Sequence, residues 1–188
     1  NAIMPSYPPF VFLILFLSVL YVNAQGKYEF SDEDIKENET QINQMVRYLQ
    51  ETLNFIGDPK VSAQEKDIIF KESYIKIFRD ENVQVEDDLD ENRGTSINKD
   101  VQAYLKDIDF FFENVSFEFE IQNIMPQLNE MSEPFFKVEM IRTIAGRNII
   151  GDTINNSTKR FLEINIDPYK KELKIVSFYT TKPNVKDE

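Results

Sequence analysis

Acidic and amide side chains at spacings of one, three and five begin a calcium-loop pattern in the middle of the chain. Asp88, Asp90 and Asn92 would supply its first oxygen ligands. The pattern then fails, because Arg93 stands where such a loop needs glycine and Lys99 where it needs a bidentate glutamate. We therefore favour a solvated acidic turn over calcium binding. On the alternative that this loop binds a metal ion, Asp88, Asp90 and Asn92 are the candidate ligands.

Aromatic side chains recur in segments that we expect to bury one face. Six of them are candidates for lining a ligand pocket: Tyr74, Phe78, Tyr104, Phe117, Phe119 and Phe136. Aromatic rings fill protein cores at low cost in conformational entropy, so core packing is favoured over ligand contact. A pocket lined by some of these rings stays open as the alternative.

Charge and composition exclude several classes of partner and site. The 188 residues include 33 acids and 21 bases, and the net charge of −12 would repel nucleic acid and anionic membrane surfaces. The chain has no cysteine and no histidine, which excludes disulfides, thiolate metal sites and the commonest general base. We predict no cofactor and no nucleic-acid partner. Hydrophobic residues form 41% of the chain, enough for the core of one domain.

The amino-terminal segment predicts export. Phe10 to Val22 is an almost unbroken apolar run, and it is short for a membrane span, which needs about 20 residues. Val22, Asn23 and Ala24 suit signal peptidase, so residues 1–24 are predicted to be a signal peptide. An uncleaved anchor is the alternative, because no lysine or arginine precedes the apolar run. We expect a mature chain without a membrane span in the periplasm, at the cell surface or outside the cell.

Three helices are predicted in the first part of the mature chain. Ser31 caps a helix over residues 31–56, in which apolar residues recur every three or four positions. Ser62-Ala63-Gln64-Glu65 is a capping box that begins a second helix over residues 62–78. A third helix is predicted over residues 98–110, capped by its first residue.

The later part of the chain alternates apolar and polar residues, which indicates strands. The predicted strands span residues 83–86, 115–121, 136–142, 160–166 and 173–180, with a loop at 122–134 and a turn at 145–148. Tight turns between the four long strands predict antiparallel pairing. The order predicts an α+β domain over residues 25–181, in which three helices pack on one face of a strongly curved sheet, and a polar tail over 182–188.

Four segments carry a resemblance to a known family: Asp100-Val101-Gln102-Ala103-Tyr104-Leu105, Asn114-Val115-Ser116-Phe117, Arg160-Phe161-Leu162-Glu163-Ile164-Asn165, and the closing run from Glu172 to Lys182. They resemble the exported amino-terminal domain of secreted proteins from Bacteroidetes-type bacteria. The element order resembles the nuclear-transport-factor-2-like superfamily, also called cystatin-like α+β, over residues 30–181. The resemblance to the superfamily implies a cone with an internal pocket. The resemblance to the exported domain implies that further modules follow this region.

The predicted function is an exported, non-enzymatic binding or assembly module whose ligand is unidentified. A protein partner or a homodimer through the sheet face is open, and so is a small-molecule ligand. The alternative is a pocket-bearing binder or a ketosteroid-isomerase-like enzyme, which places an aspartate base and a tyrosine donor in an apolar pocket. Scattered candidates such as Tyr48, Tyr74, Asp107 and Asp109 match no such pattern residue by residue.

Overall fold

Helix α2 is the long helix that the amphipathic pattern predicted. In the computed structural model, which describes residues 28–90, 94–167, 170 and 172–180, it spans Asp32–Gly57. Its amino terminus is capped as expected, because the Ser31 hydroxyl accepts a hydrogen bond from the backbone nitrogen of Asp34 at 3.1 Å. The helix ends in contact with the sheet at Gly57, where an added Cβ would lie 2.3 Å from the Val115 carbonyl oxygen. The predicted signal peptide and the polar tail lie outside the described residues.

The second predicted helix is shorter than expected. Helix α3 spans Ala63–Lys71 and begins with the predicted capping box between Ser62 and Glu65. A separate 3₁₀ helix, η1, follows at Ser73–Lys76. The α-helix cannot continue to residue 78, because the backbone at Ile77 and Arg79 hydrogen-bonds to Ile175 of the sheet at 2.8 and 3.0 Å.

The prediction of a helix capped by Asn98 was wrong by two residues, because Asp100 holds the cap position. Asn98–Asp100 form strand β2, which pairs antiparallel with β1 at Gln84–Glu86. Helix α4 starts only at Val101 and runs to Phe111. The Asp100 carboxylate accepts a hydrogen bond from the Gln84 side chain at 2.6 Å instead of capping the helix.

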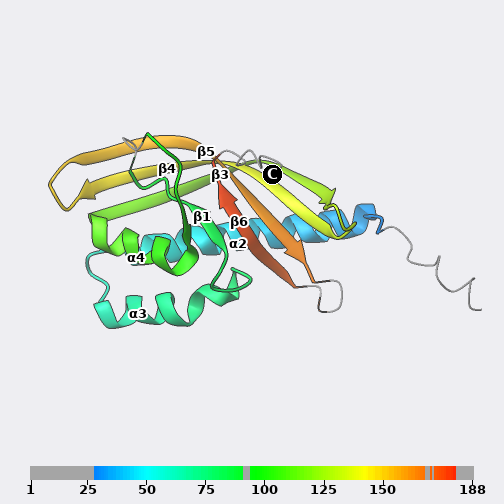
Figure 1. The fold of residues 1–188 in the computed structure, drawn as a ribbon, viewed down its shortest axis with the longest axis horizontal. Coiled ribbons are helices and arrows are strands. Elements are labelled where there is room, and N and C mark those ends of the chain that lie inside the picture. Colours follow the sequence, from blue (N-terminus) through cyan, green and yellow to red (C-terminus); the bar gives the residue numbers. More distant parts are fainter. Residues whose placement is uncertain (1–27, 91–93, 168–169, 171, 181–188) are drawn as a thin grey trace, which may run out of the picture.

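Six strands form one sheet in the order β2-β1-β6-β5-β4-β3, and the three α-helices lie on one side of it (Figure 1). The long strands are β3 (Phe112–Leu128), β4 (Pro134–Asn148) and β5 (Thr153–Ile166), followed by β6 (Leu173–Tyr179). All neighbours pair antiparallel except β1 and β6. The sheet therefore has the predicted four long strands and short early strand, with β2 added.

The long strands extend through the predicted loop and turn. Strand β3 continues to Leu128, and β4 runs through the predicted turn to Asn148. The chain reverses only after Asn148, where Gly151 has a φ of 95°. Polar residues at the ends of these strands reflect solvent exposure rather than a break in strand pairing, which a sequence pattern does not distinguish.

The outer edge of β3 is covered by two polar side chains of α2. The Asn54 side chain donates to the Phe117 carbonyl at 3.0 Å and accepts from the Phe117 backbone nitrogen at 2.6 Å. The Gln50 side chain accepts from the Phe119 backbone nitrogen at 2.7 Å. These bonds satisfy backbone groups that a terminal strand would otherwise leave unpaired.

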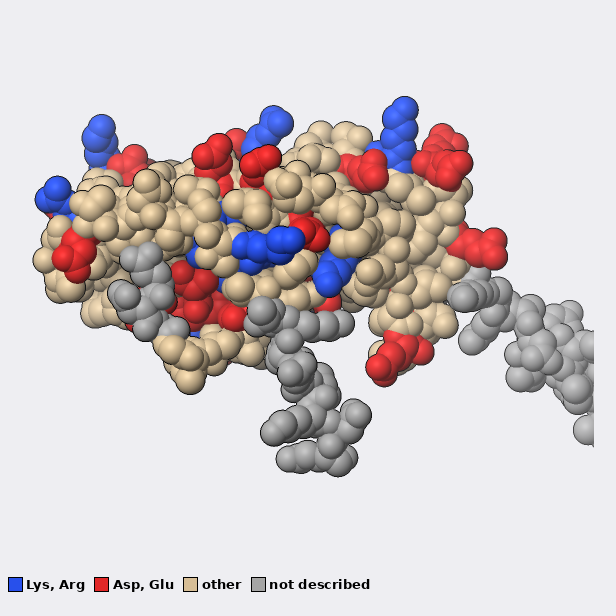
Figure 2. All heavy atoms as spheres, turned by 90° about the horizontal axis from the view of Figure 1, so that it is seen from above, with Lys and Arg blue, Asp and Glu red and all other residues tan. Residues whose placement is uncertain are grey.

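The far face of the sheet mixes apolar and charged side chains, and Figure 2 shows acids and bases interspersed there. Lys159 forms an ion pair with Glu139, and Lys137 lies 4.6 Å from the centre of the Phe161 ring. Strict alternation along β6 from Leu173 and Ile175 would place Phe178 on this face, but Phe178 is buried on the helix side and 1% exposed. The β5–β6 pairing shifts register between Glu163 and Ile164. Because of this shift, β6 side chains on either side of it do not follow one strict alternation between the two faces of the sheet. A homodimer through this face stays a prediction.

Among the described residues, no helix is both long and apolar enough to cross a membrane.

Candidate functional site

A buried carboxylate binds two arginines between the helices and the sheet. The Asp88 side chain, from the segment after β1, is 8% exposed. Its Oδ2 accepts a hydrogen bond from Arg142 Nε at 2.8 Å, and it forms ion pairs with Arg142 Nη2 at 2.6 Å and with Arg160 Nη1 at 3.0 Å. Its Oδ1 accepts a hydrogen bond from the Tyr104 hydroxyl of α4 at 3.0 Å. Four donors therefore converge on one carboxylate that is shielded from water.

The sheet positions both guanidinium groups by its register. Met140 faces Arg160, and Arg142 faces Thr158, so the two arginines are diagonal neighbours on the inner face of β4 and β5. We call Arg142 and Arg160 the arginine pair. They are 1% and 0% exposed, and they continue the inward phases of Met140 on β4 and Leu162 on β5.

Further contacts fix the arginine pair in place. Arg142 donates from Nη1 to the Asn156 side chain at 2.6 Å. Arg160 donates from Nη1 and Nη2 to the Glu86 carbonyl, both at 3.0 Å, and its Cζ lies 4.0 Å from the centre of the Phe178 ring. The guanidinium face on an aromatic ring adds a cation–π contact to the hydrogen bonds.

A second group of ions lies next to this cluster. Lys99 of β2 bridges the carboxylates of Asp87 and Asp107, and Lys66 of α3 contacts Asp109 at 2.6 Å. Asp107 and Asp109, weighed above as acid–base candidates, are thus partners of lysines and lie away from the Asp88 carboxylate's four donors. In the part of the chain that the structure describes, neither aspartate hydrogen-bonds to Tyr48 or Tyr74.

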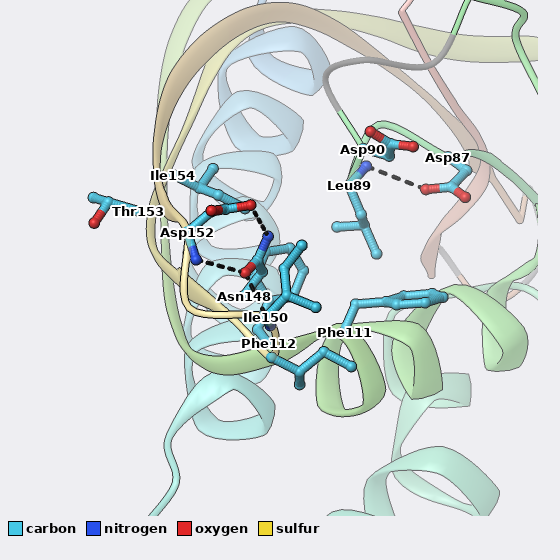
Figure 3. Close-up of a pocket in the computed structure, with 11 residues that line it drawn as sticks. Asp87, Leu89, Asp90, Phe111, Phe112, Asn148, Ile150, Asp152, Thr153 and Ile154 are labelled. Atoms are coloured by element: carbon cyan, nitrogen blue, oxygen red, sulfur yellow. Dashed lines mark hydrogen bonds between the residues drawn. The ribbon is translucent and has the colours of Figure 1, made fainter.

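An outer pocket of about 390 Å³ opens beside the buried cluster. Its lining comes from the end of α4, the turn between β4 and β5, and the segment after β1 (Figure 3): Asp87, Leu89, Asp90, Phe111, Phe112, Asn148, Ile149, Ile150, Asp152, Thr153 and Ile154. Six of these side chains are apolar, and Phe111, Ile149 and Ile150 are 41%, 59% and 79% exposed. Exposed apolar side chains around a hollow are typical of a binding surface.

Hydrogen bonds hold the walls of the outer pocket. The Asn148 side chain accepts from the backbone nitrogens of Ile150 and Asp152 at 3.1 and 2.8 Å, which orders the β4–β5 turn. The Ile149 nitrogen donates to the Phe111 carbonyl at 3.0 Å, which joins that turn to the end of α4. On the opposite wall, the Asp87 carboxylate accepts from the Leu89 nitrogen at 3.1 Å (Figure 3).

The six aromatic candidates are not in the outer pocket. Five are buried at 0–4% exposure: Tyr74, Phe78, Tyr104, Phe117 and Phe136. Phe119 is partly buried, with its ring centre 6.1 Å from that of Phe178. Tyr104 alone among the six forms a hydrogen bond within the buried cluster described here. Their expected role in the core fits their burial, and a role in ligand contact stays a prediction.

The metal candidates are dispersed rather than gathered. Asp88 turns inward to the arginine pair, Asp90 lies at the outer pocket, and Asn92 lies outside the described residues. No group of three acidic residues suited to a metal ion occurs among the residues that the structure describes.

The sequence carries a signal for the arginine pair in the phase of its apolar stripes. Arg142 continues the inward phase of Phe136, Val138 and Met140, and Arg160 shares the phase of Leu162. A charged residue in the phase of a buried apolar stripe needs a buried partner, because an unpaired charge is costly there. The outer pocket gave no such signal, since its lining comes from three separate segments.

Burial holds the pKa of Tyr104 well above its ordinary value of 10.0, and the charge of Asp88 adds to this effect. Above pH 10 an unfolded tyrosine ionises while folded Tyr104 keeps its proton, so the free energy of unfolding should fall as pH rises. We expect Tyr104→Phe to remove a slope of up to about 1.4 kcal/mol per pH unit between pH 10 and 11.5. Urea unfolding of both proteins across this range measures it, and equal slopes would contradict the prediction.

The sequence matches no family model and no curated protein. Solved structures do match. One is a nuclear-transport-factor-2-like superfamily protein from Salmonella enterica serovar Typhimurium LT2, at a TM-score of 0.52 and 9% identity over 82% of this chain and 99% of that one. Another is a putative scytalone dehydratase from Novosphingobium aromaticivorans DSM 12444, at a TM-score of 0.49 and 13% identity over 80% and 89%. The match to the Salmonella protein shows that this chain has the nuclear-transport-factor-2-like fold that its element order predicted.

Proposed function

We propose that the protein is an exported, non-enzymatic binding module that takes an apolar group of its ligand into the outer pocket. The pocket carries this proposal, because it is the place where apolar side chains of α4 and the β4–β5 turn surround an open hollow. The apolar run of residues 10–22 supports export. The module acts alone or as the front part of a longer secreted protein.

The enzyme alternative needs an aspartate that can accept a proton from a substrate. Tyr104 and Asp88 do lie within 3.0 Å of each other, as that chemistry would require. However, the Asp88 oxygens already accept from Tyr104 and from the arginine pair, and the tyrosine is 2% exposed. The arrangement is that of a structural ion cluster, which favours binding over catalysis.

Titration with benzyl alcohol, an uncharged apolar probe, tests the outer pocket. With methyl-labelled isoleucine, we expect saturable shifts of the NMR signals of Ile149, Ile150 and Ile154, because these side chains line the hollow. Ile150→Ala should weaken binding about three- to tenfold, since it removes apolar contact area.

The matched control is Ile68→Ala on α3, which removes a 49% exposed isoleucine away from the pocket and should leave the affinity unchanged. Shifts confined to other isoleucines, or equal effects of the two substitutions, would overturn the proposal.

A further inference from the structure

The contacts of Asp88 are those of a bound carboxylate ligand. One oxygen accepts a hydrogen bond from Arg142 and forms ion pairs with both members of the arginine pair, and the other oxygen accepts from the Tyr104 hydroxyl. Fork-like guanidinium groups recognise carboxylates with this geometry in binding sites. Here the carboxylate belongs to the chain itself.

The arginine pair has donor capacity beyond what Asp88 uses. Nε of Arg160 is buried and has no hydrogen-bond partner among the described residues. Such a donor is costly in a protein interior, and it commonly marks a place where a ligand or water completes the bonding. In addition, the two positively charged guanidinium groups share one negatively charged carboxylate. Binding of a further acceptor atom by the arginine pair would therefore be favourable.

Asp88 separates the arginine pair from the outer pocket. Its neighbours Asp87 and Leu89 line that pocket, while the Asp88 side chain points to the other side of the same backbone segment. Three aspartates line the outer pocket and would repel a carboxylate there, whereas the arginine pair attracts one. These charges allow one orientation of an anionic ligand, with the carboxylate inward and an apolar body in the outer pocket.

We propose that the arginine pair is a carboxylate-binding site, that Asp88 occupies it from within the chain, and that a monocarboxylate ligand with an apolar body competes with Asp88. The position of the apolar body rests on the proposed function, but the carboxylate site does not. When the ligand binds, its carboxylate replaces that of Asp88 on the arginine pair. The two buried guanidinium groups therefore have a carboxylate partner both with and without the ligand.

Acetate is the probe for the carboxylate site, used with the full chain carrying Asp88→Ala. We expect acetate at ten times its dissociation constant to raise the melting temperature by about 3–6 °C, saturably. Sodium chloride at equal ionic strength should not reproduce the rise. Wild-type protein should respond at least tenfold more weakly, because Asp88 competes from a tethered position.

Asp109→Ala is the matched control, because it also removes a carboxylate from a buried cation, Lys66, whose ion pair is separate from those of the arginine pair. It should gain no saturable response to acetate. If the Asp88→Ala protein refolds poorly, its refolding yield should rise in acetate and not in chloride, and Asp88→Asn provides a second variant with the same expected acetate response. Equal responses to acetate and chloride, or no response in either Asp88 variant, would overturn the carboxylate site.

Hexanoate tests the apolar body. It should bind the Asp88→Ala protein at least tenfold more tightly than acetate, because each additional buried methylene contributes about 0.8 kcal/mol, or fourfold. Equal affinities for hexanoate and acetate would contradict the part of the proposal that gives the ligand an apolar body. Failure of benzyl alcohol to bind the wild-type protein would instead overturn the outer pocket while the acetate result stands, so the two proposals fail separately.

Discussion

Replacing Asp88 with alanine is expected to lower the free energy of unfolding by about 3–5 kcal/mol in the absence of added carboxylates. The substitution leaves two guanidinium groups, 0% and 1% exposed, without their shared carboxylate. It also removes the acceptor of the Tyr104 hydroxyl. Urea denaturation followed by circular dichroism measures the loss.

A double-mutant cycle with Arg160→Met shows whether this loss comes from unpaired charge. With one guanidinium already removed, Asp88→Ala should cost at least about 1 kcal/mol less than in the wild-type background. Equal costs in both backgrounds would mean that Asp88 and Arg160 are not coupled. A loss below about 1 kcal/mol in the wild-type background would contradict the buried ion cluster itself.

Replacing Phe136 with alanine is expected to cost about 3–5 kcal/mol of unfolding free energy, because it leaves a cavity in the core. The Phe136 side chain is 0% exposed on the inner face of β4, and its ring centre lies 5.4 Å from that of Phe30. If this ring instead lined an open ligand pocket, its removal would change ligand affinity and leave stability nearly unaltered. Thermal and urea unfolding of the purified variant distinguish the two roles.

Phe110→Ala is the matched control for this prediction. It makes the same chemical change at a ring that is 67% exposed on α4 and contacts Phe111 edge-on at 5.1 Å. We expect a cost of about 1 kcal/mol or less. Similar losses at residues 110 and 136 would contradict the assignment of Phe136 to the core.

The sequence predicted the order of elements well because helix and strand leave different apolar periods. Ser31 and the capping box at Ser62 marked two helix starts correctly, since capping is a local interaction. Elements defined by long-range pairing were harder to predict. Strand β2 forms because Asn98–Asp100 meet β1, and the second helix stops because its continuation bonds to Ile175.

The candidate site was predictable only in part, and for the same reason. Asp88 and Tyr104 were both singled out, the first as a metal ligand and the second as a pocket aromatic, but nothing local relates them. The cluster that they form with Arg142 and Arg160 depends on the β4–β5 register, which brings the two arginines onto one inner face. The outer pocket combines three distant segments and depends on tertiary structure throughout.

The bonds from Asn54 and Gln50 to the backbone of β3 have a consequence for self-association. Over Phe117 and Phe119, this margin of the sheet cannot accept a strand from another chain unless α2 first withdraws. Polymerisation by strand addition is therefore disfavoured there by the polar face of a helix.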